Sequence, residues 1–97
     1  MRYVYILHLN NGKLYTGITD NLKRRITEHR GGKVTSTRYL LPAKLIHYEA
    51  YLVEEDANRR ERYLKTTEGK RFLRQQLKVF FQQTYGEVPE RLKGPRC

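Results

Sequence analysis

The chain has 97 residues, with 20 lysines and arginines against 10 aspartates and glutamates, for a formal net charge of +10. This length suits one domain and is too short for two. A domain of this size buries only roughly 60–70% of its unfolded surface, so we expect any active site to be a shallow cleft that suits a polymeric substrate. Cys97 is the single cysteine, which excludes an intramolecular disulfide and a cysteine-based metal site.

The excess of positive charge predicts a polyanionic partner. A net charge of +10 on a short chain favours nucleic acid, and eight tyrosines and three phenylalanines are mixed with the basic residues. No segment approaches the ~20 apolar residues that a membrane span needs, and the apolar run at the start is too short for a signal peptide. We therefore expect a cytoplasmic protein that binds nucleic acid and no membrane, with a monomer favoured.

Apolar patterns and turn signals predict six regular elements. Aromatic, β-branched and aliphatic runs predict strands, and helical spacing with capping residues predicts helices. In chain order these are strands at 3–9 and 13–19, a helix at 22–30, an irregular loop at 33–41, a strand at 45–52, and helices at 55–65 and 68–82. The order ββαβαα predicts an α/β (α+β) domain at 1–83, a small three-stranded antiparallel or mixed sheet flanked by helices. We expect a loosely ordered tail at 84–97.

The loop between the first two strands decides which residues share a face. Its sequence, Asn-Asn-Gly at 10–12, is a strong hairpin signal. A two-residue loop would send Tyr5 and Tyr15 to opposite faces. A three-residue loop ending in a left-handed glycine would pair Leu7 with Tyr15 and make the tyrosines diagonal neighbours, roughly 7–8 Å apart. We predict the three-residue loop, although two strand tyrosines can also be simple packing residues.

The first predicted helix carries a second candidate pair. Arg25 and His29 lie one turn apart, so they project from the same side of the helix. An arginine can donate two hydrogen bonds to a phosphate and so stabilise a transition state that gains negative charge. The alternative is a solvated basic helix face, because Lys23, Arg24 and Arg30 are close by.

Two further positions each allow two interpretations. Glu61 stands one turn before Lys65, so it either forms an ordinary i, i+4 ion pair or serves as a hard oxygen ligand for Mg²⁺. Gly17 is unusual within a strand, and marks either a bulge or a close approach to the backbone.

Four segments in order resemble the GIY-YIG nuclease family over roughly residues 3–77. The segments are Tyr3-Val4-Tyr5, Tyr15-Thr16-Gly17, the helix 20–29 that carries Arg25 and His29, and Arg60 to Lys65 around Glu61. The likeness is greatest to the small bacterial members that consist of little more than the catalytic module. Some branches carry a lysine where this chain has Ile18, so Lys13 or Lys65 would have to take its place.

The resemblance implies a role for each residue. Tyr15 would act as a general base on the attacking water or relay its proton, supported by Tyr5. Arg25 would stabilise the phosphate and His29 would position water or phosphate. Glu61 would hold a single Mg²⁺ or Mn²⁺ ion. We further expect the substrate to approach Gly17 closely, and basic side chains to contact it, namely Lys13, Arg24, Arg38 and Lys65.

These features together predict a metal-dependent endonuclease that hydrolyses phosphodiester bonds. We expect DNA rather than RNA, recognition of structure rather than sequence, and a part in DNA repair or processing. The alternative is a non-catalytic nucleic-acid-binding module on the same scaffold. A third possibility is a basic partner of an acidic protein, which would not need the tyrosines, Arg25 and Glu61 to converge.

Overall fold

A computed structural model of the protein describes residues 1–85 and contains three strands and four helices. They are β1 (Arg2–His8), β2 (Leu14–Thr19), α1 (Leu22–Arg30), β3 (Lys44–Tyr51), α2 (Glu54–Leu64), α3 (Thr67–Gln76) and α4 (Lys78–Tyr85). The chain divides into two compact units, Met1–Lys65 and the segment that begins at Thr66. Of the predicted tail, 84–85 end α4 and the rest lies outside the described residues. None of the described helices has the length and apolar character that crossing a membrane requires.

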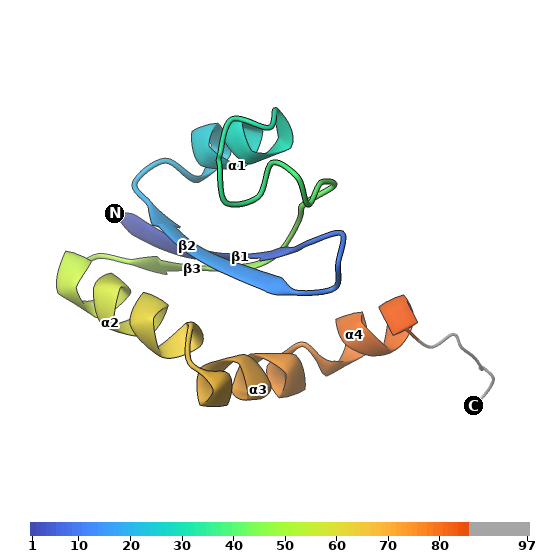
Figure 1. The fold of residues 1–97 in the computed structure, drawn as a ribbon. Helices are drawn as coiled ribbons and strands as arrows, with labels where there is room; N and C mark the ends of the chain where they lie inside the picture. Colours follow the sequence, from blue (N-terminus) through green and yellow to red (C-terminus); the bar gives the residue numbers. More distant parts are fainter. Residues whose placement is uncertain (86–97) are drawn as a thin grey trace. The chain divides into compact units, whose positions relative to one another are not determined.

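The first unit is a single antiparallel sheet between two helices. The strand order is β2-β1-β3, so β1 is central and β2 is an edge strand. Figure 1 shows α1 on one side of the sheet and α2 on the other. Because side chains alternate along a strand, β1 sends Tyr5 and Leu7 toward α1, and Val4 and Ile6 toward α2. All four are buried. This arrangement confirms the predicted fold class.

The hairpin between β1 and β2 has the predicted three-residue loop. The Leu9 N–H donates to the Lys13 carbonyl at 2.9 Å, which closes the loop, and Gly12 adopts a φ of 83°. Only glycine adopts such a left-handed conformation without steric cost. The resulting register pairs Leu7 with Tyr15, as predicted.

Both ends of α1 are capped by its own sequence. The Asn21 side chain accepts a hydrogen bond from the Arg24 N–H at 3.1 Å, which satisfies one free donor of the first turn. At the other end, Gly32 has a φ of 74° and its N–H donates to the His29 carbonyl at 3.1 Å. The Lys33 N–H reaches back to the Glu28 carbonyl at 3.0 Å. These last two bonds form a Schellman motif, which ends α1 at its predicted last residue.

An ion-pair cluster fastens α2 to β3. Glu49 of β3 accepts two hydrogen bonds from Arg60 of α2, at 2.9 and 3.2 Å. Its carboxylate also accepts one from the Tyr51 hydroxyl at 2.6 Å and contacts His47 Nε2 at 2.9 Å. Burial acts to raise the pKa of Glu49, but these hydrogen bonds outweigh it and lower the pKa to about 2. Glu49, Arg60, Tyr51 and His47 are called the Glu49 cluster below.

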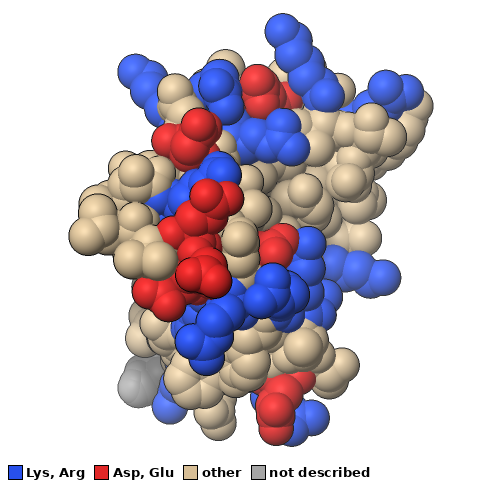
Figure 2. Space-filling view, turned by 90° about the vertical axis from the view of Figure 1, so that its left-hand side faces the viewer, with Lys and Arg blue, Asp and Glu red and all other residues tan. Residues whose placement is uncertain are grey.

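The first turn of α2 carries Glu54, Glu55 and Asp56, where negative charge is favoured by the helix dipole. Figure 2 shows acidic side chains gathered beside basic ones on one face of the molecule, so the positive charge is not evenly spread. The sheet side of α2 carries Ala57 and Leu64, both fully buried. Tyr63 is 37% exposed, because it lies about 100° around the helix from Leu64.

The second unit contains α3 and α4, where one helix at 68–82 was predicted. The prediction of a single helix is wrong, because Leu77 ends α3 with φ −103° and ψ 33°. No glycine or proline stands near Leu77 to mark this break. Thr66 caps α3 by accepting a hydrogen bond from the Gly69 N–H at 3.0 Å. Within the unit, Arg74 lies over the Phe81 ring at 4.8 Å from its centroid.

Candidate active site

The two predicted tyrosines share the α1 face of the sheet. Their ring centroids lie 6.4 Å apart, which confirms that Tyr5 and Tyr15 are neighbours on one face. Tyr5 is buried on the central strand, whereas Tyr15 is half-buried on the edge strand β2. Tyr15 is therefore the more accessible of the pair.

Gly17 provides the space for the Tyr5 ring. The two residues are direct cross-strand partners, with no register shift between β1 and β2. A Cβ added at Gly17 would overlap the ring carbon Cζ and the hydroxyl of Tyr5, and would lie 2.8 Å from its Cε1. The close approach to the backbone is thus made by Tyr5, and the bulge interpretation is wrong. Contact between Gly17 and a substrate stays a prediction.

His29 lies fully buried between Tyr5 and the loop that follows α1. Its Nε2 is 2.9 Å from the Tyr5 hydroxyl and its Nδ1 is 2.8 Å from the Thr37 hydroxyl. The His29 ring also packs against the Tyr15 ring at 5.3 Å between centroids. Burial and the charge of Arg25 lower the pKa of His29. Both ring nitrogens therefore contact protein groups, and His29 does not face solvent.

Arg25 completes the group on the α1 face. Its side chain hydrogen-bonds the Tyr5 hydroxyl, which raises the pKa of Arg25. Burial raises the pKa of Tyr5, and Arg25 offsets this only in part. A guanidinium can only donate, so the Tyr5 oxygen accepts from Arg25 and its proton is free to be donated to His29 Nε2. In that arrangement the neutral histidine donates its Nδ1–H to Thr37. Tyr5, Tyr15, Arg25, His29 and Thr37 are called the tyrosine cluster below.

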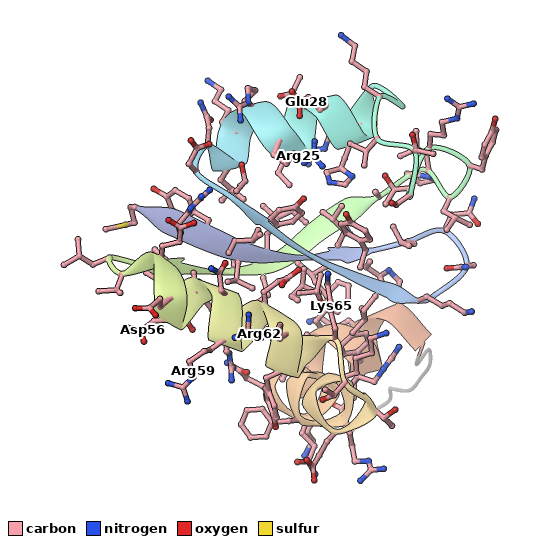
Figure 3. All side chains as sticks on the ribbon, turned by 60° about the vertical axis from the view of Figure 1, so that its left-hand side comes forward. Arg25, Glu28, Asp56, Arg59, Arg62 and Lys65 are labelled. Atoms are coloured by element: carbon pink, nitrogen blue, oxygen red, sulfur yellow. The ribbon has the colours of Figure 1, made fainter. Side chains whose placement is uncertain are left out.

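The guanidinium of Arg25 retains access to solvent. Its side chain is 35% exposed, and it forms an ion pair with Glu28 at 3.1 Å on the same helix. Figure 3 shows Arg25 extending from α1 toward the sheet. Because a guanidinium carries five N–H donors, Arg25 can bind Tyr5 and Glu28 and still donate to a phosphate. Arg25 is therefore the cation of this site best placed to meet a phosphodiester.

Glu61 belongs to a different face of the sheet. It lies on α2, where its carboxylate binds the Lys65 ammonium at 2.6 Å and its side chain is 16% exposed. In Figure 3, Lys65 extends from the end of α2 toward the sheet, whereas Asp56 and Arg59 extend away from it. Among residues 1–85, the polar partner of Glu61 is Lys65 and not a member of the tyrosine cluster. Glu61 and the tyrosine cluster lie on opposite faces of the same strands, because α2 packs against β1 and β2, which carry Tyr5 and Tyr15.

The other predicted contact residues are exposed and spread over three segments. Lys13 lies at the hairpin. Arg24 lies on α1, with ion pairs to Asp20 at 3.4 Å and Glu28 at 3.8 Å. Arg38 lies in the loop after α1 and stacks on Tyr39, with 4.8 Å from Cζ to the ring centroid. Their contacts with nucleic acid stay predictions.

Two functional partners were missed at the sequence level. Thr37 falls in the segment predicted to be an irregular loop, and it is fully buried against His29. Glu28 forms an ion pair with Arg25 three residues before it. Side chains three residues apart on a helix are neighbours, so this pair was predictable from the sequence. No comparable local rule links Thr37 to His29, since their contact depends on how the loop after α1 folds back.

Within residues 1–85, no three His, Cys, Asp or Glu side chains gather in a way that could hold a metal ion. Mg²⁺ keeps several of its waters and often takes only one or two protein ligands, so a single carboxylate can hold it.

A small α+β domain with tyrosines, a histidine and an arginine beside its edge strand resembles the catalytic module of a nuclease. The family described as the GIY-YIG catalytic domain matches residues 1–75. The chain belongs to the GIY-YIG family, which is a nuclease class whose domain implies binding of nucleic acid.

Bacterial UPF0213 proteins are similar to this chain in sequence and in fold. UPF0213 protein SAG0778 of Streptococcus agalactiae is 42% identical over 64 residues, which cover 65% of this chain and 73% of the relative. UPF0213 protein CPE1444 of Clostridium perfringens is 42% identical over 66 residues, covering 67% and 71%. The solution structure of UPF0213 protein BH0048 from Bacillus halodurans is similar in fold, with a TM-score of 0.55 and 34% identity. That match covers 88% of this chain and 95% of the solved one.

Proposed function

We propose that this protein is a metal-dependent endonuclease that hydrolyses phosphodiester bonds in nucleic acid, with DNA favoured over RNA. The observation that carries the proposal is the convergence of Arg25, Tyr5 and Tyr15 beside β2, an open edge of the sheet. The family membership supports the reaction class. A small domain offers few base-specific contacts, and phosphate contacts position a substrate without reading its sequence. We therefore favour recognition of nucleic-acid structure, in repair or processing.

Tyr15 and Arg25 are the groups that a substrate can reach. A water oxygen attacks phosphorus, one ester P–O bond breaks, and the products are a phosphate monoester and a free hydroxyl. Tyr15 is half-buried at the edge strand, so a water molecule can reach its hydroxyl. In the proposed reaction Tyr15 takes the proton of the attacking water or relays it. The Arg25 guanidinium donates to the phosphate oxygens that gain charge in the transition state.

Tyr5 and His29 act through these two residues. Both are buried, and the hydrogen bond between them measures 2.9 Å. Tyr5 fixes the guanidinium of Arg25, and the His29 ring packs against Tyr15. We assign both as positioning residues, since a guanidinium held in place before the substrate arrives loses less conformational freedom on binding.

Glu61 is the residue that would hold a divalent metal ion. Its carboxylate fits Mg²⁺ or Mn²⁺ as a hard oxygen donor, and it already binds a cation, the Lys65 ammonium, at 2.6 Å. On the same face of β2, the buried Thr16 hydroxyl lacks a hydrogen-bond partner among the described residues. When bound, such an ion would supply Lewis-acid activation of the phosphate. A nucleic-acid backbone lying along the β2 edge would meet α1 on one side and α2 on the other.

Cleavage of labelled DNA tests the proposal. Single-stranded, duplex and branched DNA are incubated with Mg²⁺ or Mn²⁺, using the wild type, Glu61→Gln and the matched control Glu55→Gln. Glu55 is exposed in the first turn of the same helix. We expect metal-dependent cutting by the wild type and the control, and cutting by Glu61→Gln that is slower by about 100-fold or more. Equal rates for all three proteins would contradict the role of Glu61.

One observation favours a binding module without cleavage as the second candidate. Glu61 is paired with Lys65 on α2, while the tyrosine cluster lies on the opposite face of the sheet. A binding module needs no convergence of Glu61 with the cluster. Binding of DNA by the wild type without cutting on any substrate, at any metal concentration, would establish this second function in place of the first.

A further inference from the structure

An open cleft of about 620 Å³ lies between α1 and the sheet. Tyr3 of β1 and Tyr48 of β3 line it from the sheet, and Lys23, Ile26 and Arg30 line it from α1. Tyr48 is the cross-strand partner of Tyr5, so it occupies the same face of the sheet as the tyrosine cluster. The volume falls within the range of roughly 300–1,000 Å³ that is usual for ligand sites.

The cleft lies on the other flank of α1 from Arg25. Each residue of an α-helix turns the chain by about 100°, so Arg30 lies roughly 140° around the helix from Arg25. Arg25 lies on the flank of α1 that faces Tyr15 and the edge strand β2. Arg30 and Lys23 lie on the flank that faces β3. The cleft is thus a second polar and aromatic site on the same face, separate from the proposed active site.

Aromatic rings from the sheet form one side of the cleft. Tyr48 is 54% exposed, and its ring meets that of Tyr3 at 6.3 Å between centroids and an angle of 64°. Such an exposed ring can bind a flat, uncharged group by stacking. Unpaired nucleobases stack on exposed aromatic side chains whatever their identity, because every base has a π-face. A base within a duplex is already stacked on its neighbours, so this cleft suits an unpaired one.

The charged residues of the cleft suit a phosphate backbone. Lys23 and Arg30 are its cations, and its single carboxylate, Asp20, lies 3.4 Å from Arg24. The net charge at the cleft is therefore positive. A second hollow of about 500 Å³, lined by Leu41, Pro42 and Ala43, shares Arg30 with the first. A chain of nucleotides can extend from one hollow to the next past the same guanidinium.

We propose that this cleft binds an unpaired nucleotide of single-stranded nucleic acid, with the base on Tyr48 and the phosphates at Lys23 and Arg30. The proposal rests on the proposed function in taking nucleic acid as the substrate of the neighbouring site. It specifies which substrate: a molecule with an unpaired strand, such as a flap or branch, whose free strand lies on one flank of α1 while its phosphodiester meets Arg25 on the other.

A tryptophan reporter tests the contact directly, because the chain contains no tryptophan. The full-length variant Tyr48→Trp is titrated with a single-stranded thymidine oligonucleotide in EDTA, so that cleavage cannot occur. We expect saturable quenching of the indole fluorescence by the stacked base. The matched control is Tyr63→Trp, on α2 at the opposite face of the sheet and 37% exposed. Quenching that is equal in the two variants, or absent in Tyr48→Trp, would overturn the proposal.

Affinity provides a second readout. Tyr48→Ala should bind the single-stranded oligonucleotide at least about five-fold more weakly than the wild type, whereas Tyr48→Phe, which retains the ring, should bind it normally. Both variants should bind a blunt duplex like the wild type. An unchanged affinity of Tyr48→Ala for the single strand would overturn the proposal. Quenching of the indole in Tyr48→Trp by poly-glutamate and not by DNA would overturn it as well.

The two proposals fail in different ways. Cleavage of branched DNA by the wild type, without quenching in Tyr48→Trp, would leave the endonuclease standing and remove the single-strand cleft. Quenching in Tyr48→Trp with no cleavage of any substrate by the wild type would keep the cleft and replace the endonuclease by a binding module. Because Tyr48 is more than half exposed, its replacement by tryptophan or phenylalanine is expected to leave the fold intact.

Discussion

The two faces of the sheet carry clusters of the same residue types, but the arginine in each cluster has different partners. The tyrosine cluster on the α1 face and the Glu49 cluster on the α2 face each contain tyrosine, histidine and arginine side chains. On the α2 face, Glu49 stands at the centre and binds Arg60 through both oxygens. On the α1 face, Tyr5 and His29 lie at the centre, and a hydrogen bond of 2.9 Å joins the Tyr5 hydroxyl to His29 Nε2.

The position of the carboxylate decides what each arginine can do. Arg60 forms a two-pronged ion pair with Glu49, whose side chain is 18% exposed, and this pair joins α2 to β3. Arg25 is held by a hydroxyl and by the half-buried Glu28. It therefore keeps donors for an anionic substrate. The two arginines thus differ in where their carboxylate partner lies: Arg25 pairs with a residue of its own helix, whereas Arg60 pairs with a residue of the sheet.

The largest expected effect separates the two arginines. Arg25→Ala should slow DNA cleavage by about 10²–10³-fold, the usual cost of removing a donor to a transition-state oxyanion, with little change in stability. Arg60→Ala should instead lower the free energy of unfolding by about 3 kcal/mol, because it leaves the half-buried Glu49 without its main partner. Cleavage rates and urea denaturation of both variants measure this. Similar losses of stability in the two variants would contradict the division of roles.

The next effect concerns Glu49 itself. Glu49→Gln should lower the free energy of unfolding by about 3 kcal/mol, since Arg60 then lacks a charged acceptor. Glu61→Gln on α2 offers the matched control, because its partner Lys65 is more than half exposed and such pairs contribute little. Urea denaturation compares the two. A smaller loss for Glu49→Gln than for Glu61→Gln would show that the Glu49 cluster is not the contact that fastens α2.

The pH dependence of stability should show both clusters. The pKa of Glu49 is about 2 in the folded chain against an ordinary value of 4.5, so its contribution is present above pH 4.5 and is lost as pH falls toward 2. The lowered pKa of His29 adds an earlier loss that begins as pH falls below 6.5. Burial raises the pKa of Tyr51 to about 12, so stability should also fall as pH rises from 10 to 12. Thermal melts from about pH 2 to 12 measure these changes, and a Glu49→Gln melt that still falls steeply below pH 4.5 would contradict the assignment.

The smallest expected effect tests the packing of Tyr5 against Gly17. Gly17→Ala should cost about 1–3 kcal/mol, because its methyl group overlaps the Tyr5 ring. The same change in a Tyr5→Leu background should cost less, since the ring that it meets is gone. Urea denaturation of the four proteins gives the coupling between the two sites. Additive losses would show that Gly17 is required for a reason other than Tyr5.

The sequence by itself determined the features that depend on neighbouring residues. The Asn-Asn-Gly loop set the β1–β2 register and so placed both tyrosines on one face. Asn21 and Gly32 set the ends of α1, and strand alternation and helix spacing predicted the fold class. These are interactions within a few residues, where turn geometry, capping and side-chain period are sufficient to predict the outcome.

The tertiary structure decided everything that joins distant segments. It buried His29 against Thr37 and joined Arg60 of α2 to Glu49 of β3. It also placed Glu61 on the α2 face, away from the tyrosine cluster that its predicted role would join. These contacts depend on which face of the sheet each helix covers and how the loop after α1 folds back, and no local propensity contains that information.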